Sequence, residues 1–272
     1  MDARHHGGLW LVRMEDLDQA RVVPGAAAAM LRTLERFGLE WDGEVEYQSR
    51  RGEHYAAALA QLTALDLTFE CSCSRRELES EAGAAPRAYP GTCRAGPRRP
   101  GPTATRFRVS AETVSFEDRI HGTCRFGLAA LGDVVVRRRD GAFAYQLAVV
   151  LDDAAQGVTH VVRGADLLDN TPWQLALQRA LSLPPPRYAH LPLVVEPSGG
   201  KLSKSRRSIA ASPAHAGRQL HEVLGLLGQG PPAELKLEPA VVILRWAQAH
   251  WRPAQIPRTP QIATEVGFAE PM

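Results

Sequence analysis

The chain has 272 residues, of which 44% are hydrophobic and 23% are charged, and its formal net charge is +2. This composition is ordinary for a globular protein with enough chain for a packed core, and so small a charge does not mark a nucleic-acid binder. Four cysteines in a chain this long exclude a disulfide framework. No apolar run approaches the roughly 18–20 residues of a membrane span and no signal peptide opens the chain, so we expect a cytoplasmic protein.

The N-terminal part predicts a short strand followed by two helices. Leu9–Met14 is mostly apolar and runs into an acidic segment that begins at Glu15. Carboxylates that follow a buried parallel strand commonly face a ligand, although a turn or helix-capping carboxylate is the alternative for Glu15. A proline and a glycine bracket Gly25–Phe37 as a helix, and a second helix is predicted to begin after Ser49.

The middle of the chain predicts strands around an irregular insertion. Strands are predicted at Leu67–Cys71, Arg106–Val109 and Val114–Ile120, and the Gly-, Pro- and Arg-rich segment Glu79–Pro102 separates the first two. Farther on, Val134–Arg138 and Phe143–Leu151 flank Asp140-Gly141, which predicts a β-hairpin with a type I′-like turn.

The C-terminal half returns to alternating strands and helices. We predict a strand at Val158–Val162, a helix at Thr171–Leu181, a strand at His190–Val195, and helices at His215–Leu227 and Pro239–Trp251. The sequence contains neither a Walker-type phosphate loop nor a G-x-G-x-x-G fingerprint. If the protein binds a nucleotide, it must do so by another device.

The segment Gly199-Gly200-Lys201-Leu202-Ser203-Lys204-Ser205 is a candidate for such a device. Its glycines give a mobile backbone, and its lysines and serines supply donors for a polyphosphate. A loop that closes over a transferring phosphate stabilises charge that develops only in the transition state. The alternative, a solvated basic linker, is equally compatible with these residues because Arg206 and Arg207 extend the charge run.

Three cysteines and a tyrosine form a second candidate site. Cys71-x-Cys73 is followed by Tyr89-x-x-x-Cys93, and thiolates suit a structural zinc ion with four tetrahedral ligands. From the residues alone, the fourth ligand is water or Cys124, because the phenol of Tyr89 is neutral near pH 7 unless the cation displaces its proton. Reduced, unliganded cysteines are the remaining alternative.

Two motifs resemble those of a known enzyme family. Lys-Leu-Ser-Lys-Ser, at 201–205, is similar to the second signature loop of class I aminoacyl-tRNA synthetases, and Val-Arg-Gly-Ala-Asp-Leu, at 162–167, is similar to the glutamyl subgroup. Within that subgroup the chain most resembles the glutamyl-queuosine tRNA(Asp) synthetases, which are shortened paralogues of glutamyl-tRNA synthetase. The likeness runs from about Trp10 to the lysine loop and, more weakly, to the C-terminus.

The resemblance implies an α/β fold with a Rossmann-like class I catalytic domain. A zinc-containing insertion at residues 71–125 is expected to divide this domain into residues 1–70 and 126–210, and residues 211–272 are expected to form a short helical region. The family's zinc pattern implies Cys71, Cys73, Tyr89 and Cys93 as the ligands, which leaves Cys124 as a core or hairpin residue.

The resemblance also assigns substrate-binding residues. It implies that Glu15 holds the ammonium group of glutamate, that Tyr145 lends a hydroxyl to the pocket wall, and that Arg163 grips a carboxylate through its planar guanidinium. It places Lys204, as the catalytic residue, and Lys201 on ATP. A surface acid, a core tyrosine and a structural ion pair are the alternatives for Glu15, Tyr145 and Arg163 taken singly.

The implied reaction has two steps. ATP, with Mg²⁺, and L-glutamate form glutamyl adenylate with release of pyrophosphate, and the glutamyl group is then transferred to queuosine in tRNA(Asp). We expect no covalent enzyme intermediate, so catalysis rests on orientation and charge stabilisation. A cytoplasmic monomer without a membrane partner is expected.

The sequence departs from the family pattern at its start. Family members carry an opening strand and a His-x-Gly-His-type signature, and His5-His6-Gly7-Gly8 lies too close to the first strand to replace that signature. We therefore expect the true start to lie upstream of Met1. Two other interpretations remain. A glutamate–tRNA ligase acting on tRNA(Glu) would carry a longer C-terminal region, and a non-catalytic, zinc-stabilised RNA-binding relic would not need Glu15, Arg163 or Lys204.

Overall fold

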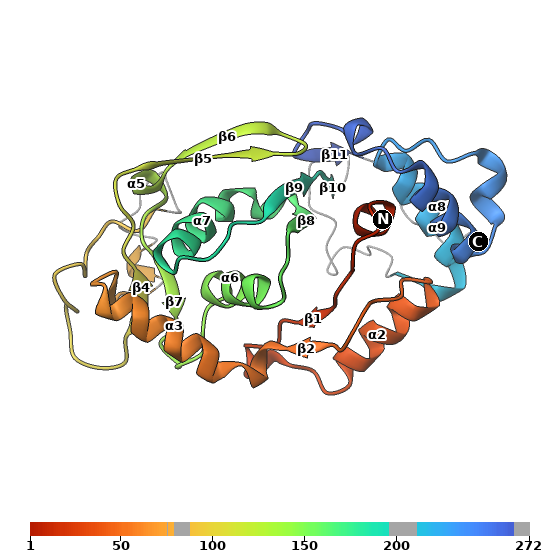
Figure 1. Cartoon of the computed structure of the whole chain (residues 1–272). Helices are drawn as coiled ribbons and strands as arrows, with labels where there is room; N and C mark the ends of the chain where they lie inside the picture. The colour runs from red at the N-terminus through yellow and green to blue at the C-terminus, as the bar shows by residue number, and fades with distance from the viewer. Residues whose placement is uncertain (75, 79–87, 196–210, 264–272) are drawn as a thin grey trace.

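The computed structural model describes residues 1–74, 76–78, 88–195 and 211–263. The helices are α1 Asp2–His5, α2 Ala26–Arg36, α3 Gly52–Ala64, α5 Leu128–Leu131, α6 Tyr145–Ala155, α7 Thr171–Ala180, α8 Ala216–Leu226 and α9 Ala240–His250 (Figure 1). The strands are β1 Arg13–Met14, β2 Glu46–Tyr47, β3 Thr68–Cys71, β4 Ala104–Phe107, β5 Thr113–Asp118, β6 Gly122–Gly127, β7 Val134–Arg137, β8 His160–Gly164, β9 Arg187–Leu191, β10 Leu193–Val195 and β11 Gln261–Ala263. No helix among these residues is long and apolar enough to cross a membrane.

A four-stranded sheet with the order β6-β5-β9-β8 carries the residues that matter most below. Strand β6 is antiparallel to β5, whereas β5, β9 and β8 run parallel to one another. The connection from β8 to β9 passes through a 3-10 turn, Ala165–Asn170, and α7, as parallel neighbours require. Because all three strands are parallel, their carboxyl ends lie at one edge of the sheet, where open α/β sheets bind ligands.

Three smaller sheets surround this one. Strands β3, β4 and β7 form an antiparallel sheet, and its first strand ends at Cys71. Strand β1 pairs in parallel with β2. Strand β10 pairs in parallel with β11, which ties the segment after β9 to the end of the described chain.

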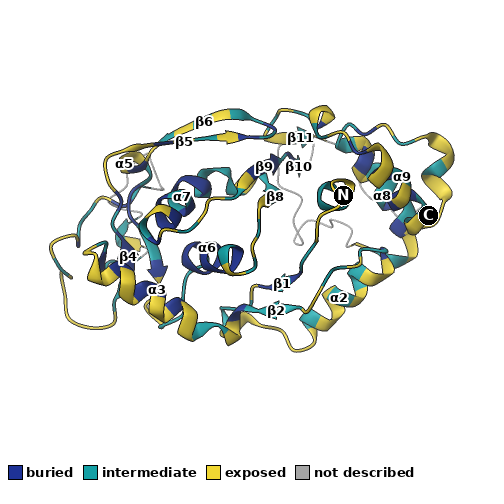
Figure 2. Ribbon diagram, in the orientation of Figure 1, coloured by how far each residue is buried: buried dark blue, intermediate teal, exposed yellow. Residues whose placement is uncertain are grey.

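Helix α6 lies between α3 and α7 near the middle of the molecule and is buried over most of its length (Figures 1 and 2). Leu147 and Ala148 are 0% exposed and Val150 is 1% exposed. They belong to one hydrophobic cluster that also contains residues of α3, α7 and β7. The run of apolar residues from Leu147 to Leu151 fits such an interior position, because a helix buried on most sides needs apolar residues on more than one face.

The predicted hairpin around Asp140-Gly141 is wrong. Its first strand exists as β7, but the second segment forms only one isolated bridge, between Arg137 and Phe143, and continues as α6. A short apolar run does not distinguish a buried strand from a buried helix. Here the polar residues that end the run, Asp152 and Asp153, find buried partners only because the segment is helical.

The predicted C-terminal helices are confirmed as α8 and α9. They form a separate hydrophobic cluster with Ile120, which follows β5, and with Ala189 on β9. The first helix of the chain packs against α9, and the ring nitrogen Nδ1 of His5 lies 2.7 Å from the carbonyl oxygen of Gln248. His5 therefore contacts the C-terminal helices, in keeping with our rejection of His5-His6-Gly7-Gly8 as a signature motif.

The predicted N-terminal helices are confirmed as α2 and α3, but two details differ. The first strand covers only the end of the predicted range, at β1. Helix α2 also presents its apolar residues largely to solvent, since Met30 is 57% exposed and no residue of this helix is buried. Helix periodicity predicts which residues share a face but not how much of that face a neighbour covers.

Candidate active site and cysteine cluster

Arg163 lies near the carboxyl end of β8 and is held by three neighbouring groups. Its Nη2 donates to the hydroxyl of Thr171 at 2.9 Å, and its Nε donates to Nε2 of His190 at 3.1 Å. The centre of its guanidinium lies 5.2 Å from the centroid of the Tyr188 ring. The hydrogen bond between Arg163 and His190 follows from the register of the sheet, because the two residues are partners on adjacent strands. The guanidinium is therefore fixed in orientation before any ligand binds.

Tyr145 is the first residue of α6 and faces the same surroundings. Burial raises the pKa of its phenol, and the guanidinium of Arg163 lowers the pKa in part. The carboxylates of Glu15 and Asp153 act on the same phenol and raise the pKa further. The phenol of Tyr145 is thus influenced by both of the other residues predicted to bind the amino acid, Glu15 and Arg163.

Glu15 follows β1 directly. Removal from water raises the pKa of its carboxyl, the nearby Arg13 lowers it, and the acidic groups of Asp153 and Asp152 raise it again. Its side chain remains 41% exposed, so a ligand can reach it. A carboxylate with a raised pKa beside other carboxylates gains from a cation, and an ammonium group would supply one.

Arg13 is a site residue that the sequence did not reveal. It donates to Asp153 at 2.9 Å and to Gln156 at 2.6 Å, and it lies 3.4 Å from Glu15. Arg13 belongs to β1 and the other two partners belong to the end of α6 or follow it. These hydrogen bonds hold β1 against α6, and with it Glu15, which directly follows β1 in the chain.

The neighbouring Asp152 is fully buried and joins α6 to the start of α3. It accepts hydrogen bonds from Arg51 at 2.6 Å, from Gln48 at 2.8 Å and from Tyr55 at 2.8 Å. A buried carboxylate with three donors is well compensated for its loss of hydration. The only sign of it in the sequence was an acidic pair after an apolar run, which is also typical of an exposed turn.

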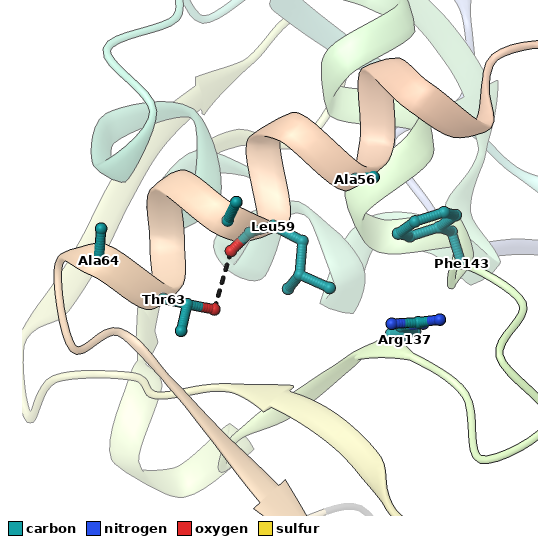
Figure 3. Close-up of a pocket in the computed structure, with 7 residues that line it drawn as sticks. Ala56, Leu59, Thr63, Ala64, Arg137 and Phe143 are labelled. Carbon is teal, nitrogen blue, oxygen red and sulfur yellow. Dashed lines mark hydrogen bonds between the residues drawn. The ribbon is translucent and has the colours of Figure 1, made fainter.

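Other predicted positions are not part of this neighbourhood. Lys201 and Lys204 lie outside the described residues. An open, mostly apolar groove runs between α3 and β7 instead, and Figure 3 shows Phe143 and Arg137 near Ala56 at one end of it, with Thr63 and Ala64 at the other end. Its lining includes none of Glu15, Tyr145 and Arg163. The groove is separate from the candidate active site.

The predicted cysteines lie together. The sulfur atoms of Cys71, Cys73 and Cys93 are all within 4.8 Å of one another, and two of them, Cys73 and Cys93, are 3.5 Å apart. The phenolic oxygen of Tyr89 lies 3.5 Å from the sulfur of Cys71 and accepts a hydrogen bond from the backbone N–H of Cys93 at 2.7 Å. The Arg106 guanidinium covers the Tyr89 ring at 3.9 Å.

The protonation of this cluster fits a divalent cation. Burial would raise the pKa of Cys93, but the N–H groups of Ser72 and Arg98 and neighbouring side-chain donors lower it to about 6. Burial and the contact with Cys93 raise the pKa of Cys73 to about 12, and burial with the contact to Cys71 raises that of Tyr89. One thiolate is already available, and a bound cation would displace the remaining protons.

Cys124 lies elsewhere. It belongs to β6 in the hairpin with β5, and its thiol donates to the carbonyl of Gly122 at 3.6 Å. It is not a member of the cysteine cluster. The alternative that used Cys124 as a fourth ligand is therefore wrong, and its placement as a hairpin residue is confirmed.

Comparison with known proteins gives one consistent family. Residues 1–217 match the family described as tRNA synthetases class I (E and Q), catalytic domain. A glutamyl-Q tRNA(Asp) synthetase of Ectopseudomonas mendocina is 52% identical over 264 residues, which are 97% of this chain and 88% of that protein. Its namesake from Pseudomonas aeruginosa is 52% identical over 97% of this chain and 89% of that protein. The Geobacter sulfurreducens protein of the same name is 50% identical over 94% of this chain and 85% of its own length.

Solved structures agree on the fold. A glutamate tRNA ligase from Elizabethkingia meningosepticum, crystallised with its amino acid, superposes with a TM-score of 0.75 at 22% identity and covers 95% of this chain and 61% of the ligase. The corresponding synthetase from Elizabethkingia anophelis gives a TM-score of 0.74 at the same identity. Together with the match over residues 1–217, these findings assign the chain to the class I tRNA synthetases of the E and Q family, with their mixed α/β catalytic domain.

Proposed function

We propose that this protein activates glutamate with ATP and transfers the glutamyl group to queuosine in tRNA(Asp). The observation that carries the proposal is the identity of 50–52% over nearly the whole chain to proteins named glutamyl-Q tRNA(Asp) synthetase. The surroundings of Tyr145 support it, because an anionic group, Glu15, and a cationic group, Arg163, both act on its phenol.

In the first step, a carboxylate oxygen of glutamate attacks the α-phosphorus of ATP and pyrophosphate leaves. Arg163 binds one glutamate carboxylate, Glu15 binds the ammonium group, and the Tyr145 hydroxyl limits the pocket. Lys204 and Lys201, with Mg²⁺, neutralise the phosphates. Each residue acts by orientation or charge, which is how enzymes that form no covalent intermediate lower their barriers.

In the second step, a hydroxyl oxygen of the cyclopentene-diol of queuosine attacks the activated carbonyl. AMP leaves, and the hydroxyl proton is released. No residue needs to form a bond to the glutamyl group. The protein is proposed to act as a cytoplasmic monomer.

The cysteine cluster is proposed to hold zinc through Cys71, Cys73, Tyr89 and Cys93. The ion would supply a structural crosslink between the end of β3 and the segment around Cys93. Arg139 supports this arrangement by donating to the carbonyls of Ser72 and Cys73, each at 2.9 Å. The crosslink takes no part in the two chemical steps.

Glutamate-dependent exchange of pyrophosphate into ATP tests the first step. The protein is expressed from its natural gene, with any coding sequence upstream of Met1, and glutamate is compared with aspartate and glutamine. We expect exchange with glutamate only. A folded protein that catalyses no exchange would end the proposal. Lys204→Ala is expected to abolish exchange while tRNA binding persists, whereas a non-catalytic RNA-binding protein would lose nothing.

A further inference from the structure

A buried pair of side chains stands behind Arg163 and takes no part in the scheme above. His190 is 0% exposed and Asp118 is 3% exposed. The two residues belong to β9 and β5, whereas Arg163 belongs to β8, so three parallel strands each contribute one member. The contacts run in series, because Nδ1 of His190 lies 2.6 Å from Oδ2 of Asp118 and its Nε2 accepts from Nε of Arg163 at 3.1 Å.

The two oxygens of Asp118 have different partners. Oδ1 accepts the backbone N–H groups of Ile120 at 2.9 Å and His121 at 3.0 Å, and the N–H of His190 lies 3.4 Å away. Within the described part of the chain, Oδ2 faces the imidazole alone. The backbone therefore fixes which oxygen of the carboxylate meets the ring.

This arrangement selects one tautomer of His190. An ionised carboxylate only accepts hydrogen bonds, so Nδ1 must carry the proton and Nε2 must present its lone pair. A guanidinium only donates, so Arg163 can bond to Nε2 in this tautomer and not in the other. Thr171, 0% exposed, accepts from Nη2 of Arg163 and lies 3.2 Å from the same Nε2.

We propose that Asp118 and His190 are positioning residues for glutamate recognition: Asp118 fixes the tautomer of His190, and His190 holds the guanidinium of Arg163 in the plane that receives the substrate carboxylate. The inference rests on the proposed function, because it takes Arg163 as the carboxylate-binding residue. Neither Asp118 nor His190 needs to touch the substrate. Because the contact is buried, water cannot easily replace a lost acceptor.

Asp118→Asn is the direct test. The backbone N–H groups that donate to Oδ1 in the wild type hold the amide oxygen of the new asparagine in the same place. Its amide NH₂ group therefore takes the place of Oδ2 and donates to Nδ1 of His190. His190 must then carry its proton on Nε2, where it opposes the N–H of Arg163. We expect the KM for glutamate in pyrophosphate exchange to rise roughly 10- to 100-fold, the range for a lost hydrogen bond to a charged group, with the KM for ATP changed by less than about twofold.

A pair of substitutions at His190 separates positioning from stability. In His190→Gln, the side-chain amide oxygen can replace Nε2 as the acceptor for Arg163, and it remains an acceptor whether position 118 is Asp or Asn. In His190→Asn, the side chain can reach Asp118 but is too short to reach Arg163. We expect the KM for glutamate to rise in His190→Asn and to stay close to the wild-type value in His190→Gln. Adding Asp118→Asn to the glutamine variant should have little further effect on that KM, because no tautomer remains to be reversed.

Asp133→Asn is the matched control. Asp133 is also a 3% exposed carboxylate that accepts a backbone N–H, from Val109 at 2.9 Å, and pairs with an arginine, Arg94, at 2.5 Å. The Asp133→Asn variant should be less stable than the wild type but should have the same KM for glutamate. The ¹⁵N shifts of His190 give a readout without substrate, with Nε2 unprotonated in the wild type and protonated in the Asp118→Asn variant.

The outcomes are distinct. Wild-type protein without glutamate-dependent exchange would end the proposed function and this inference with it. An active wild type combined with an unchanged KM in Asp118→Asn, or an unaltered tautomer, would end the inference alone. Should the Asp118 variant fail to fold, equal KM values for the two His190 variants would contradict the proposal in the same way.

Discussion

Asp118 illustrates, at the scale of single residues, how a buried carboxylate stays charged in this protein. Burial raises its pKa, but the hydrogen bond with His190 and the N–H groups of His121 and Ile120 outweigh burial and lower the pKa to about 2. A carboxyl with a lowered folded-state pKa stabilises the fold above its unfolded pKa and loses that contribution as the pH falls through the folded value.

The first prediction follows from this sign. Above about pH 4 the ionised Asp118 contributes about 2 kcal/mol to the free energy of unfolding, and this contribution falls as the pH is lowered toward 2. The difference in stability between wild type and Asp118→Asn should therefore narrow between pH 5 and pH 3. Urea unfolding at pH 5 and at pH 3 measures the difference in unfolding free energy between the two proteins. The same difference at both pH values would contradict the lowered pKa of Asp118.

A second prediction concerns the shape of the cation at 163. Arg163→Lys keeps the charge but loses the planar fork and the Nε–H that meets His190. We expect the KM for glutamate to rise roughly 10- to 100-fold in pyrophosphate exchange. Arg187→Lys, at an exposed position on β9, is the control and should behave as wild type. Equal KM values for Arg163→Lys and Arg187→Lys would contradict the placement of Arg163 in the glutamate-binding site.

The residues assigned from sequence were those within a recognisable motif. Glu15, Tyr145 and Arg163 could be named because their neighbours in the chain resemble a family pattern. The partners of Arg13 and His190 could not be named, because they lie 140 and 72 residues away in the chain. Which distant side chains meet is decided by strand register and helix packing, and a single sequence contains no direct record of either.

At the scale of elements, α6 joins the core to the site. It starts at Tyr145, carries Leu147 and Val150 in the core, and ends with the carboxylates that hold Arg13 and Arg51. One helix thus sets the position of Tyr145 and, through Arg13, that of β1. The same segment was predicted as a strand, since its apolar run fits both structures and only the packing around it decides.

The third prediction tests this central position. Leu147→Ala leaves a cavity in a fully buried part of α6 and should lower the free energy of unfolding by about 2–5 kcal/mol. Leu237→Ala provides the matched control, because Leu237 is 92% exposed and its truncation should change stability by less than about 0.5 kcal/mol. Urea unfolding compares the two variants. Similar losses in both would mean that α6 is not part of the core.

The fourth prediction concerns the cysteine cluster. Cys93→Ser removes the thiol whose pKa is lowered to about 6 and should abolish zinc binding, whereas Cys124→Ser, on the separate β5–β6 hairpin, should retain it. Metal content of purified protein, measured by atomic emission, distinguishes the variants. Zinc-free wild type, or full zinc content in the Cys93 variant, would contradict the assignment.

At the scale of the whole molecule, the parallel strands and the C-terminal helices meet near the first helix. The helical cluster of α8 and α9 contacts Ile120, which follows β5, and Ala189 on β9, and α1 packs on α9 (Figure 1). The α/β class, most helices and the cysteine cluster could be predicted from periodicity, spacing and resemblance. The division of the described strands into four sheets could not, because pairing joins segments that are distant in the chain and a strand as short as β2 leaves no hydrophobic pattern of its own.

The acceptor of the glutamyl group tests the central claim most directly. Radiolabelled glutamate and ATP are incubated with the protein and with tRNA(Asp) that carries queuosine, tRNA(Asp) from cells that cannot make queuosine, or tRNA(Glu). We expect label on the queuosine-containing tRNA(Asp) alone. Label on tRNA(Glu), or equal label on both forms of tRNA(Asp), would contradict it.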